Sequence, residues 1–86
     1  NIIENLIKRN RIKILLIVLQ EGEINISKLA KISKINYKTL RNEIEILKNK
    51  GYIDVISLGR SIIIRPNLSN PKLLLIKNLL EELMEI

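Results

Sequence analysis

Cysteine and histidine are both missing from this chain of 86 residues. Without thiolate or imidazole side chains the chain cannot form disulfides, and it lacks the commonest ligands of zinc and haem. The same two residue types are also the most readily activated nucleophile and the usual general base at neutral pH. We therefore expect no metal, no cofactor and no enzymatic activity.

Long hydrophobic runs are missing too, since the longest apolar stretch covers only residues 14–19. That length is far below the roughly 20 residues of a membrane-spanning helix, and no signal-peptide pattern is present. We expect a soluble, cytoplasmic protein with no membrane partner. A chain with 47% apolar residues can build one core, but at this length it is only marginally stable alone, which favours a single domain that forms a dimer.

Acidic residues are scarce relative to basic ones, with nine Asp and Glu against fifteen Lys and Arg and a net charge of +6. The excess is uneven, because residues 1–66 carry a charge of +7 and residues 67–86 carry −1. A concentrated positive charge is typical of proteins that bind polyanions. By itself it fits DNA, RNA or an anionic membrane, and a merely well-solvated basic surface is the simpler alternative.

The first half of the chain predicts two helices with a short strand between them. Residues 2–20 contain neither Gly nor Pro and have apolar side chains at helical spacing, although a polar cluster at residues 8–11 interrupts them. This segment is either one long helix or two helices that meet at the cluster, and Gly22 is suited to end it. Alternation at residues 23–26 predicts a very short strand, and Ser27 is the predicted cap of the next helix.

A third helix is predicted to follow a turn at residues 33–36, with Asn36 as its N-cap. Its apolar residues are spaced by three or four positions and therefore share one face. They are Tyr37, Leu40, Ile44 and Leu47. Gly51 is expected to end this helix, because glycine is favoured at positive φ just beyond a helix C-terminus.

From Tyr52 onward the apolar period changes to two, which predicts a β-hairpin with Gly59 at its turn. Pro66 has no amide hydrogen for the strand ladder and is expected to end the second strand. An Asn-Pro pair at residues 70–71 then predicts a final helix over residues 71–86. The chain is thus predicted to be an α+β protein that is mainly α-helical.

This order of elements resembles that of the winged helix-turn-helix. Residues 25–53 also resemble, without a gap, the helix-turn-helix segment of bacterial and archaeal winged-helix regulators. The matching positions are Ser27, Leu29 with Ala30, Ile35, Thr39 after Asn36, Leu40 with Ile44, Leu47, Gly51 and Ile53. With the first helix the resemblance covers residues 11–66, and it departs at Ser33 and Lys34, where many relatives have Gly.

The resemblance implies a three-helix core with a β-hairpin wing over residues 1–66, in which residues 1–10 form a helical extension. The chain is also similar in size and composition to small archaeal winged-helix proteins with a C-terminal dimerisation helix, which residues 67–86 would form. The implied function is sequence-specific binding of double-stranded DNA as a homodimer, at the nucleoid, with no small-molecule effector evident. Transcriptional regulation, most simply repression by covering a promoter, is the leading hypothesis.

The third helix supplies the candidate base contacts, because its apolar face must turn inward and its polar face outward. An α-helix fits the major groove of B-DNA, and residues near its start read base edges. Arg41 can donate two hydrogen bonds to guanine, Asn42 can pair with adenine, and Lys38 can reach a base or a phosphate. Tyr37, partly on the buried face, is assigned to the core or to a phosphate contact. Ordinary solvated helix residues are the simpler alternative.

Phosphate and minor-groove contacts are assigned to two other elements. The lysines of the second helix and its turn recur every third residue and are candidates for the phosphate backbone: Lys28, Lys31 and Lys34. In the family the wing touches the minor groove, and Arg60 is the matching position here. Arginine suits a narrow, electronegative groove, with Ser61 and Arg65 as weaker candidates.

The final helix is expected to form the dimer. Its apolar side chains cover about half of its circumference, more than one small domain is expected to bury. The predicted interface residues are Leu73, Ile76, Leu79, Leu80 and Leu83, completed from the N-terminus by Ile3 and Leu6. The alternative is that this helix simply packs back on its own core.

Two alternative functions remain. One is an architectural, chromatin-like protein that coats DNA with little sequence preference. The other is a winged helix used to bind proteins or RNA, since a fold alone does not fix function.

Overall fold

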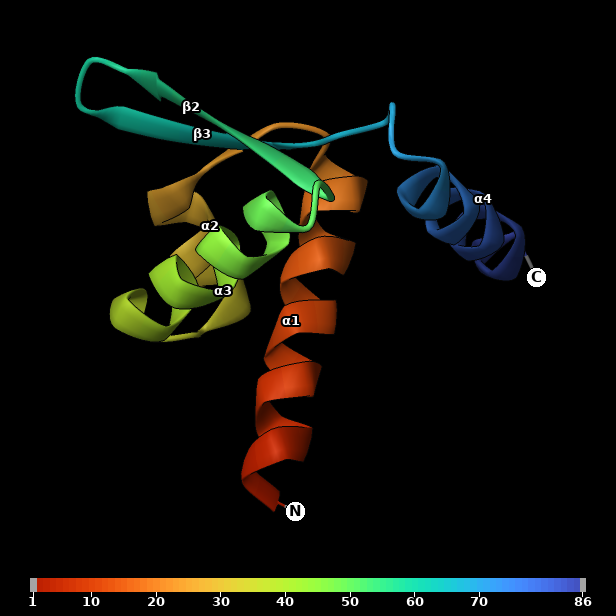
Figure 1. The fold of residues 1–86 in the computed structure, drawn as a ribbon, viewed down its shortest axis with the longest axis horizontal. Helices are drawn as coiled ribbons and strands as arrows, with labels where there is room; N and C mark the ends of the chain where they lie inside the picture. Colours follow the sequence, from red (N-terminus) through yellow and green to blue (C-terminus); the bar gives the residue numbers. More distant parts are fainter. Residues whose placement is uncertain (1, 86) are drawn as a thin grey trace.

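A computed structural model describes the backbone of residues 2–85 and the side chains of residues 9–85. The elements are α1 (Ile2–Glu21), β1 (Ile24–Asn25), α2 (Ile26–Ser33), α3 (Tyr37–Asn49), β2 (Ile53–Leu58), β3 (Ser61–Pro66) and α4 (Pro71–Met84) (Figure 1). This order confirms the predicted winged helix-turn-helix: a helical core, a β-hairpin wing and an added C-terminal helix.

Helix α1 is one continuous helix, so the polar cluster at residues 8–11 does not break it. Ile14 and Val18 turn into the core and are completely buried. The helix ends as predicted at Gly22, whose φ is +79° and whose amide donates to the Val18 carbonyl at 2.9 Å. The N-terminal half of α1 extends well beyond α2 and α3 (Figure 1).

The start of α2 corrects one prediction, because its N-cap is Asn25 and not Ser27. The Asn25 side-chain oxygen accepts a hydrogen bond from the Lys28 amide at 2.8 Å, and Asn25 itself is extended. Both residue types are good caps. Asn25 is the cap because the helix already begins at Ile26, whose side chain is buried in the core.

The turn between α2 and α3 forms without glycine. Lys34 takes the left-handed conformation, with φ of 58°, and its amide donates to the Ala30 carbonyl at 3.0 Å. The Ser33 hydroxyl accepts from the Ile35 amide at 3.2 Å and is buried. Asn36 then caps α3 as predicted, accepting from the Thr39 amide at 2.9 Å.

The sheet has three antiparallel strands in the order β1-β3-β2. The hairpin of β2 and β3 was predicted, whereas the pairing of Ile24 with Ile64, which joins β1 to the wing, was not. Val55 lies opposite Ile64, and this face of the hairpin packs on the core. The second strand ends at Pro66, as predicted.

One core joins α1, α2, α3 and the base of the sheet. Its buried residues are Ile14, Val18, Ile24, Ile26, Leu29, Ile35, Leu40, Ile44, Leu47, Ile53 and Ile64. No helix within residues 2–85 is long and apolar enough to span a membrane.

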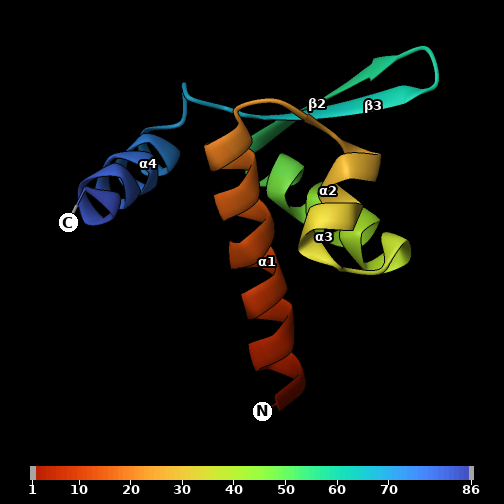
Figure 2. The same cartoon turned by 180° about the vertical axis from the view of Figure 1, so that it is seen from behind.

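Helix α4 is held by hydrogen bonds to the end of the helix-turn-helix. The side-chain amides of Asn67 and Asn70 both donate to the Gly51 carbonyl, at 3.1 and 3.0 Å. Asn70 also caps α4 by accepting from the amides of Lys72 and Leu73. In both views α4 lies on the other side of α1 from α2 and α3 (Figures 1 and 2).

Candidate nucleic-acid interface

Helix α3 has a buried apolar face and an exposed polar face. Leu40, Ile44 and Leu47 retain 0, 4 and 2% of their accessible surface. Because these three point inward, the residues between them must point outward. The five side chains predicted to face outward are all exposed, namely Lys38, Arg41, Asn42, Glu45 and Asn49, and Lys48 is exposed as well.

Of the two roles predicted for Tyr37, core residue and phosphate contact, the first is wrong. Tyr37 is 52% exposed at the first position of α3. Helical spacing places it on the same face as Leu40, but at the first turn of α3 the core covers only about half of the residue. The phosphate contact through its hydroxyl therefore stays as its predicted role.

Positive charge is concentrated along α2 and α3. Residues 26–50 contain seven basic and two acidic residues, and one of the acidic residues is buried in an ion pair. Lys28, Lys31 and Lys34 are all exposed. Lys28 lies 3.8 Å from the Glu21 carboxylate, but both side chains are well solvated, so water screens this pair strongly. Among the described side chains, no carboxylate pairs with Lys38 or Arg41.

The wing presents a narrow basic tip. Gly59 and Arg60 form a two-residue turn between paired Leu58 and Ser61. Gly59 has φ of +62°, whereas Arg60 has negative φ, a combination typical of a type II′ hairpin turn. Arg60 and Ser61 are exposed at this tip. Arg65 lies at the other end of the strand, opposite Asp54.

A buried ion pair joins α3 to α1 and was missed in the sequence. The Glu43 side chain is only 6% exposed, and its carboxylate accepts a hydrogen bond from Arg11 Nε at 2.7 Å. This hydrogen bond raises the pKa of the Arg11 guanidinium above its ordinary value. The signal was present, because position 43 lies among the inward positions of α3 and the chain offers an arginine at the helix it packs against.

The predicted DNA-contacting residues thus lie on α2, α3 and the wing. Figure 1 shows the wing extending on the same side of α1 as α2 and α3, away from α4. The elements that carry these residues therefore lie on one side of α1 (Figure 1). Within the described residues, no group of three or more Asp and Glu residues is placed to hold a metal ion.

The predicted dimer residues fall into three groups. The prediction that Leu73 lies in the dimer interface is wrong, because this side chain is completely buried within the single chain. Ile76 and Leu80 are half-buried, and Leu79 and Leu83 are each 57% exposed. Helix α4 therefore packs on its own chain through its first turn and leaves other leucines open. The remaining two, Ile3 and Leu6, lie outside the residues whose side chains are described.

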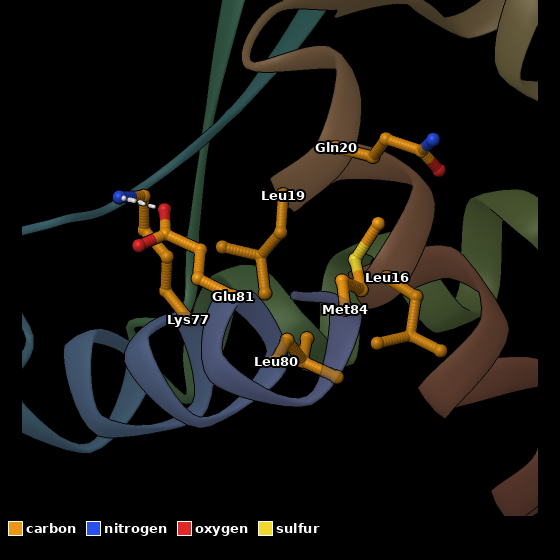
Figure 3. A pocket seen from close by; sticks show the side chains of 7 residues that line it. All are labelled: Leu16, Leu19, Gln20, Lys77, Leu80, Glu81 and Met84. Atoms are coloured by element: carbon orange, nitrogen blue, oxygen red, sulfur yellow. Dashed lines mark ion pairs between the residues drawn. The ribbon is translucent and has the colours of Figure 1, made fainter. Parts of the chain in front are cut away.

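An apolar groove of about 490 Å³ lies between α1 and α4 (Figure 3). Leu16 and Leu19 approach it from α1, and Leu80 and Met84 approach it from α4. At its edge Lys77 and Glu81 form an ion pair at 2.8 Å. The two helices thus border a common apolar surface without a tight contact along their length.

No protein-family model matches the chain, and no curated protein matches it in sequence. Solved structures do match its fold. HlyU from Vibrio cholerae has a TM-score of 0.75 at 16% identity, covering 87% of this chain and 78% of HlyU. The antimony-specific transcriptional repressor AntR has a TM-score of 0.69 at 19% identity, covering 85% of this chain and 64% of AntR. AF1382 from Archaeoglobus fulgidus has a TM-score of 0.74 at 18% identity, covering 99% of this chain and 94% of that protein.

At such identities the likeness shows a common fold. The chain is a winged helix-turn-helix protein, and it shares this fold with at least one transcriptional repressor. The likeness to AF1382 covers nearly the whole chain, so it includes α4 as well as the helix-turn-helix.

Proposed function

We propose that this protein binds double-stranded DNA as a homodimer and regulates transcription, most simply as a repressor that covers a promoter. The observation that carries the proposal is the outward face of α3. Lys38, Arg41 and Asn42 are exposed there on a helix whose other face is fixed by the core. A rigid helix with guanidinium, ammonium and amide groups near its start suits readout of base edges in the major groove.

Each of the three side chains has a distinct role in this proposal. Arg41 donates two hydrogen bonds to guanine, Asn42 pairs with adenine through one donor and one acceptor, and Lys38 contacts a base or a phosphate. A good base contact of this kind discriminates by roughly 1–3 kcal/mol. Three such contacts are enough for sequence preference within one half-site.

The surrounding residues supply affinity without sequence information. Lys28, Lys34 and the Tyr37 hydroxyl contact phosphates beside the groove, while Arg60 and Ser61 reach the neighbouring minor groove through the wing. Each neutralised phosphate contributes about 0.9 to the slope of log affinity against log salt. Binding is therefore expected to weaken steeply with salt. In a cell the protein is expected at the nucleoid.

A second copy of the chain is the proposed occupant of the apolar surface of α4. Leu75, Leu79 and Leu83 are spaced by four residues, all are exposed, and they lie along one stripe. On α1 the exposed Ile12 and Leu16 have the same spacing. A two-fold axis places such a stripe against its own copy, which buries it without any other partner.

Charge also favours this arrangement. Residues 67–86 carry a net charge of −1 whereas residues 1–66 carry +7, so the segment that contains α4 lacks the positive charge that attracts polyanionic DNA. A dimer through α4 and α1 leaves the two copies of α3 free to meet the duplex. Half-sites about one helical turn apart, roughly 34 Å, and a palindromic target are then expected.

The test is selection of duplexes from a random pool, followed by titration of selected and random DNA at several salt concentrations. A sequence-specific regulator is expected to prefer its selected site by more than about 10³-fold, with a palindromic consensus. A ratio near one would instead favour the architectural alternative. Absence of duplex binding at low salt would contradict both.

A further inference from the structure

One apolar side chain of the wing, that of Leu58, is exposed to water. Leu58 is 61% exposed at the end of β2, where the hairpin turns. Every other apolar residue of β2 and β3 is buried or half-buried, whereas residues 57–61 are all exposed. Leu58 therefore contributes nothing to the core, and an exposed leucine is disfavoured in water.

The turn gives Leu58 a defined position. The two-residue turn at Gly59 and Arg60 sets Leu58 opposite Ser61 at the last pair of the ladder. Ile56 and Ile63, two pairs further from the turn, share its face of the hairpin, but Leu58 itself is opposite the small Ser61 and stays 61% exposed. Leu58 and Arg60 are two residues apart, which keeps their Cα atoms within about 7 Å of each other. An apolar group and a guanidinium thus occupy the same narrow tip.

The absence of negative charge near the tip indicates which kind of partner it can approach. No acidic residue occurs anywhere in residues 55–80, and the carboxylate of Asp54 lies at the opposite end of the hairpin from Leu58. A tip without negative charge can approach closely spaced phosphates. It also extends on the same side of α1 as α2 and α3 (Figure 1), so a duplex lying along α3 is close to it.

We infer that Leu58 is an apolar wedge that enters the DNA minor groove beside Arg60 and kinks the duplex. The minor groove is about 6 Å wide, which excludes a two-stranded ribbon but admits single side chains from its tip. Leucine is among the residues that enter between base steps and bend DNA by roughly 20–90°. The preferred position is a pyrimidine–purine step, which unstacks most easily. This inference rests on the proposed function and adds bending to it.

The experiment compares wild-type protein with Leu58→Ala, Leu58→Met, Arg60→Ala and the control Leu68→Ala. The probe is a duplex of about 30 bp, recovered from a random pool by the wild type and labelled at both ends for energy transfer. Affinity is measured at several salt concentrations, and thermal melts confirm that each variant folds. Leu68 is a suitable control because it is also exposed but lies in the loop before α4.

Leu58→Ala is expected to lower affinity about tenfold and to straighten the bound duplex, with an unchanged salt slope. Leu58→Met is expected to restore both the affinity and the bend, because methionine also serves as a wedge. Arg60→Ala is expected to reduce the salt slope by about 0.9. Leu68→Ala is expected to behave as wild type.

Three results would overturn the inference while leaving DNA binding intact. They are an unbent duplex in the wild-type complex, wild-type affinity and bend for Leu58→Ala, and a loss of affinity with an unchanged bend. A wild-type protein that binds no duplex would overturn the proposed function and this inference together.

Discussion

Helices α3 and α4 are of similar length, with 13 and 14 residues, but α3 exposes mainly polar side chains to water and α4 exposes many apolar ones. Helix α3 buries Leu40, Ile44 and Leu47 and exposes charged and amide side chains. Helix α4 buries only Leu73 completely and leaves leucines such as Leu75 exposed. In the function proposed above, the exposed face of α3 binds a polyanion and the exposed face of α4 binds an apolar protein surface.

The two helices also differ in the contacts that hold them in place. Helix α3 is held by the core and by the ion pair between Arg11 and Glu43. Helix α4 is held mainly at its first turn, by Asn67, Asn70 and the burial of Leu73. A rigid α3 suits readout of bases, whereas a helix anchored at one end gains stability when a second copy covers its open side.

The largest expected effect comes from removing the cations of α3 and the wing. The triple variant Lys38→Ala, Arg41→Ala, Arg60→Ala is expected to lose about 10³-fold in affinity for a selected duplex, since each contact contributes roughly 1–3 kcal/mol. Its melting temperature is expected to stay unchanged, because all three side chains are exposed. Fluorescence anisotropy measures the affinity. Lys72→Ala, at an exposed lysine on α4, is the control. An equal loss of binding free energy per removed charge in the two proteins would assign binding to net charge alone.

The next largest effect is expected on α4. The double variant Leu79→Glu, Leu83→Glu places four carboxylates in the proposed dimer interface and is expected to weaken association at least about 100-fold. Sedimentation equilibrium measures the association, and circular dichroism checks that the monomer remains folded. Leu74→Glu is the control on the same helix, because Leu74 is also exposed but helical spacing sets it beside Asn78, away from the stripe of Leu75, Leu79 and Leu83. Unaltered association of the double variant would remove α4 from the interface.

Breaking the ion pair between α1 and α3 is expected to have a moderate effect. Arg11→Ala leaves the Glu43 carboxylate buried without its partner and is expected to cost about 2 kcal/mol of unfolding free energy. The joint replacement Arg11→Met, Glu43→Met removes both charges and is expected to lie closer to wild type. Because the hydrogen bond to Glu43 raises the pKa of Arg11 above its ordinary value, the contribution of the pair is fully present at neutral pH and is lost only as the pH rises through that raised pKa. Urea unfolding near neutral pH measures these values, and a larger loss for the joint replacement would contradict this account.

The smallest effect is expected at the turn before α3. Lys34→Gly relieves the left-handed conformation of a residue with a Cβ and is expected to stabilise the fold by about 0.5–1 kcal/mol. The same change removes a cation from the proposed phosphate-binding surface, so the salt slope of DNA binding is expected to fall by about 0.9. Calorimetry and salt titration measure the two effects. A fall in melting temperature would contradict the expectation that the left-handed conformation of Lys34 costs stability.

The helix-turn-helix could be predicted because its signals are local. Asn36 and Gly51 mark the ends of α3, and the spacing of Leu40, Ile44 and Leu47 fixes which side chains point outward. Once the inward face is set, the exposure of Lys38, Arg41 and Asn42 follows from helix geometry alone.

The remaining details depend on contacts between distant segments. The pairing of β1 with β3 joins residues about 40 positions apart, and no local pattern encodes it. Leu73 resembles its leucine neighbours in the sequence, but it is the one that is buried, at the end of α4 where Asn67 and Asn70 donate hydrogen bonds to Gly51. Glu43 was assigned no role from the sequence, because its partner Arg11 lies 32 residues away on α1.

The central claim, that α3 and the wing face the duplex while α4 faces a second copy, is tested most directly by amide NMR. Spectra are recorded as a selected duplex is added to the protein, and again as the free protein is diluted. Addition of DNA is predicted to shift the resonances of residues 37–42 and 58–61 and to leave residues 75–83 unchanged, whereas dilution is predicted to do the reverse. DNA-induced shifts centred on α4, with α3 unaffected, would contradict the account.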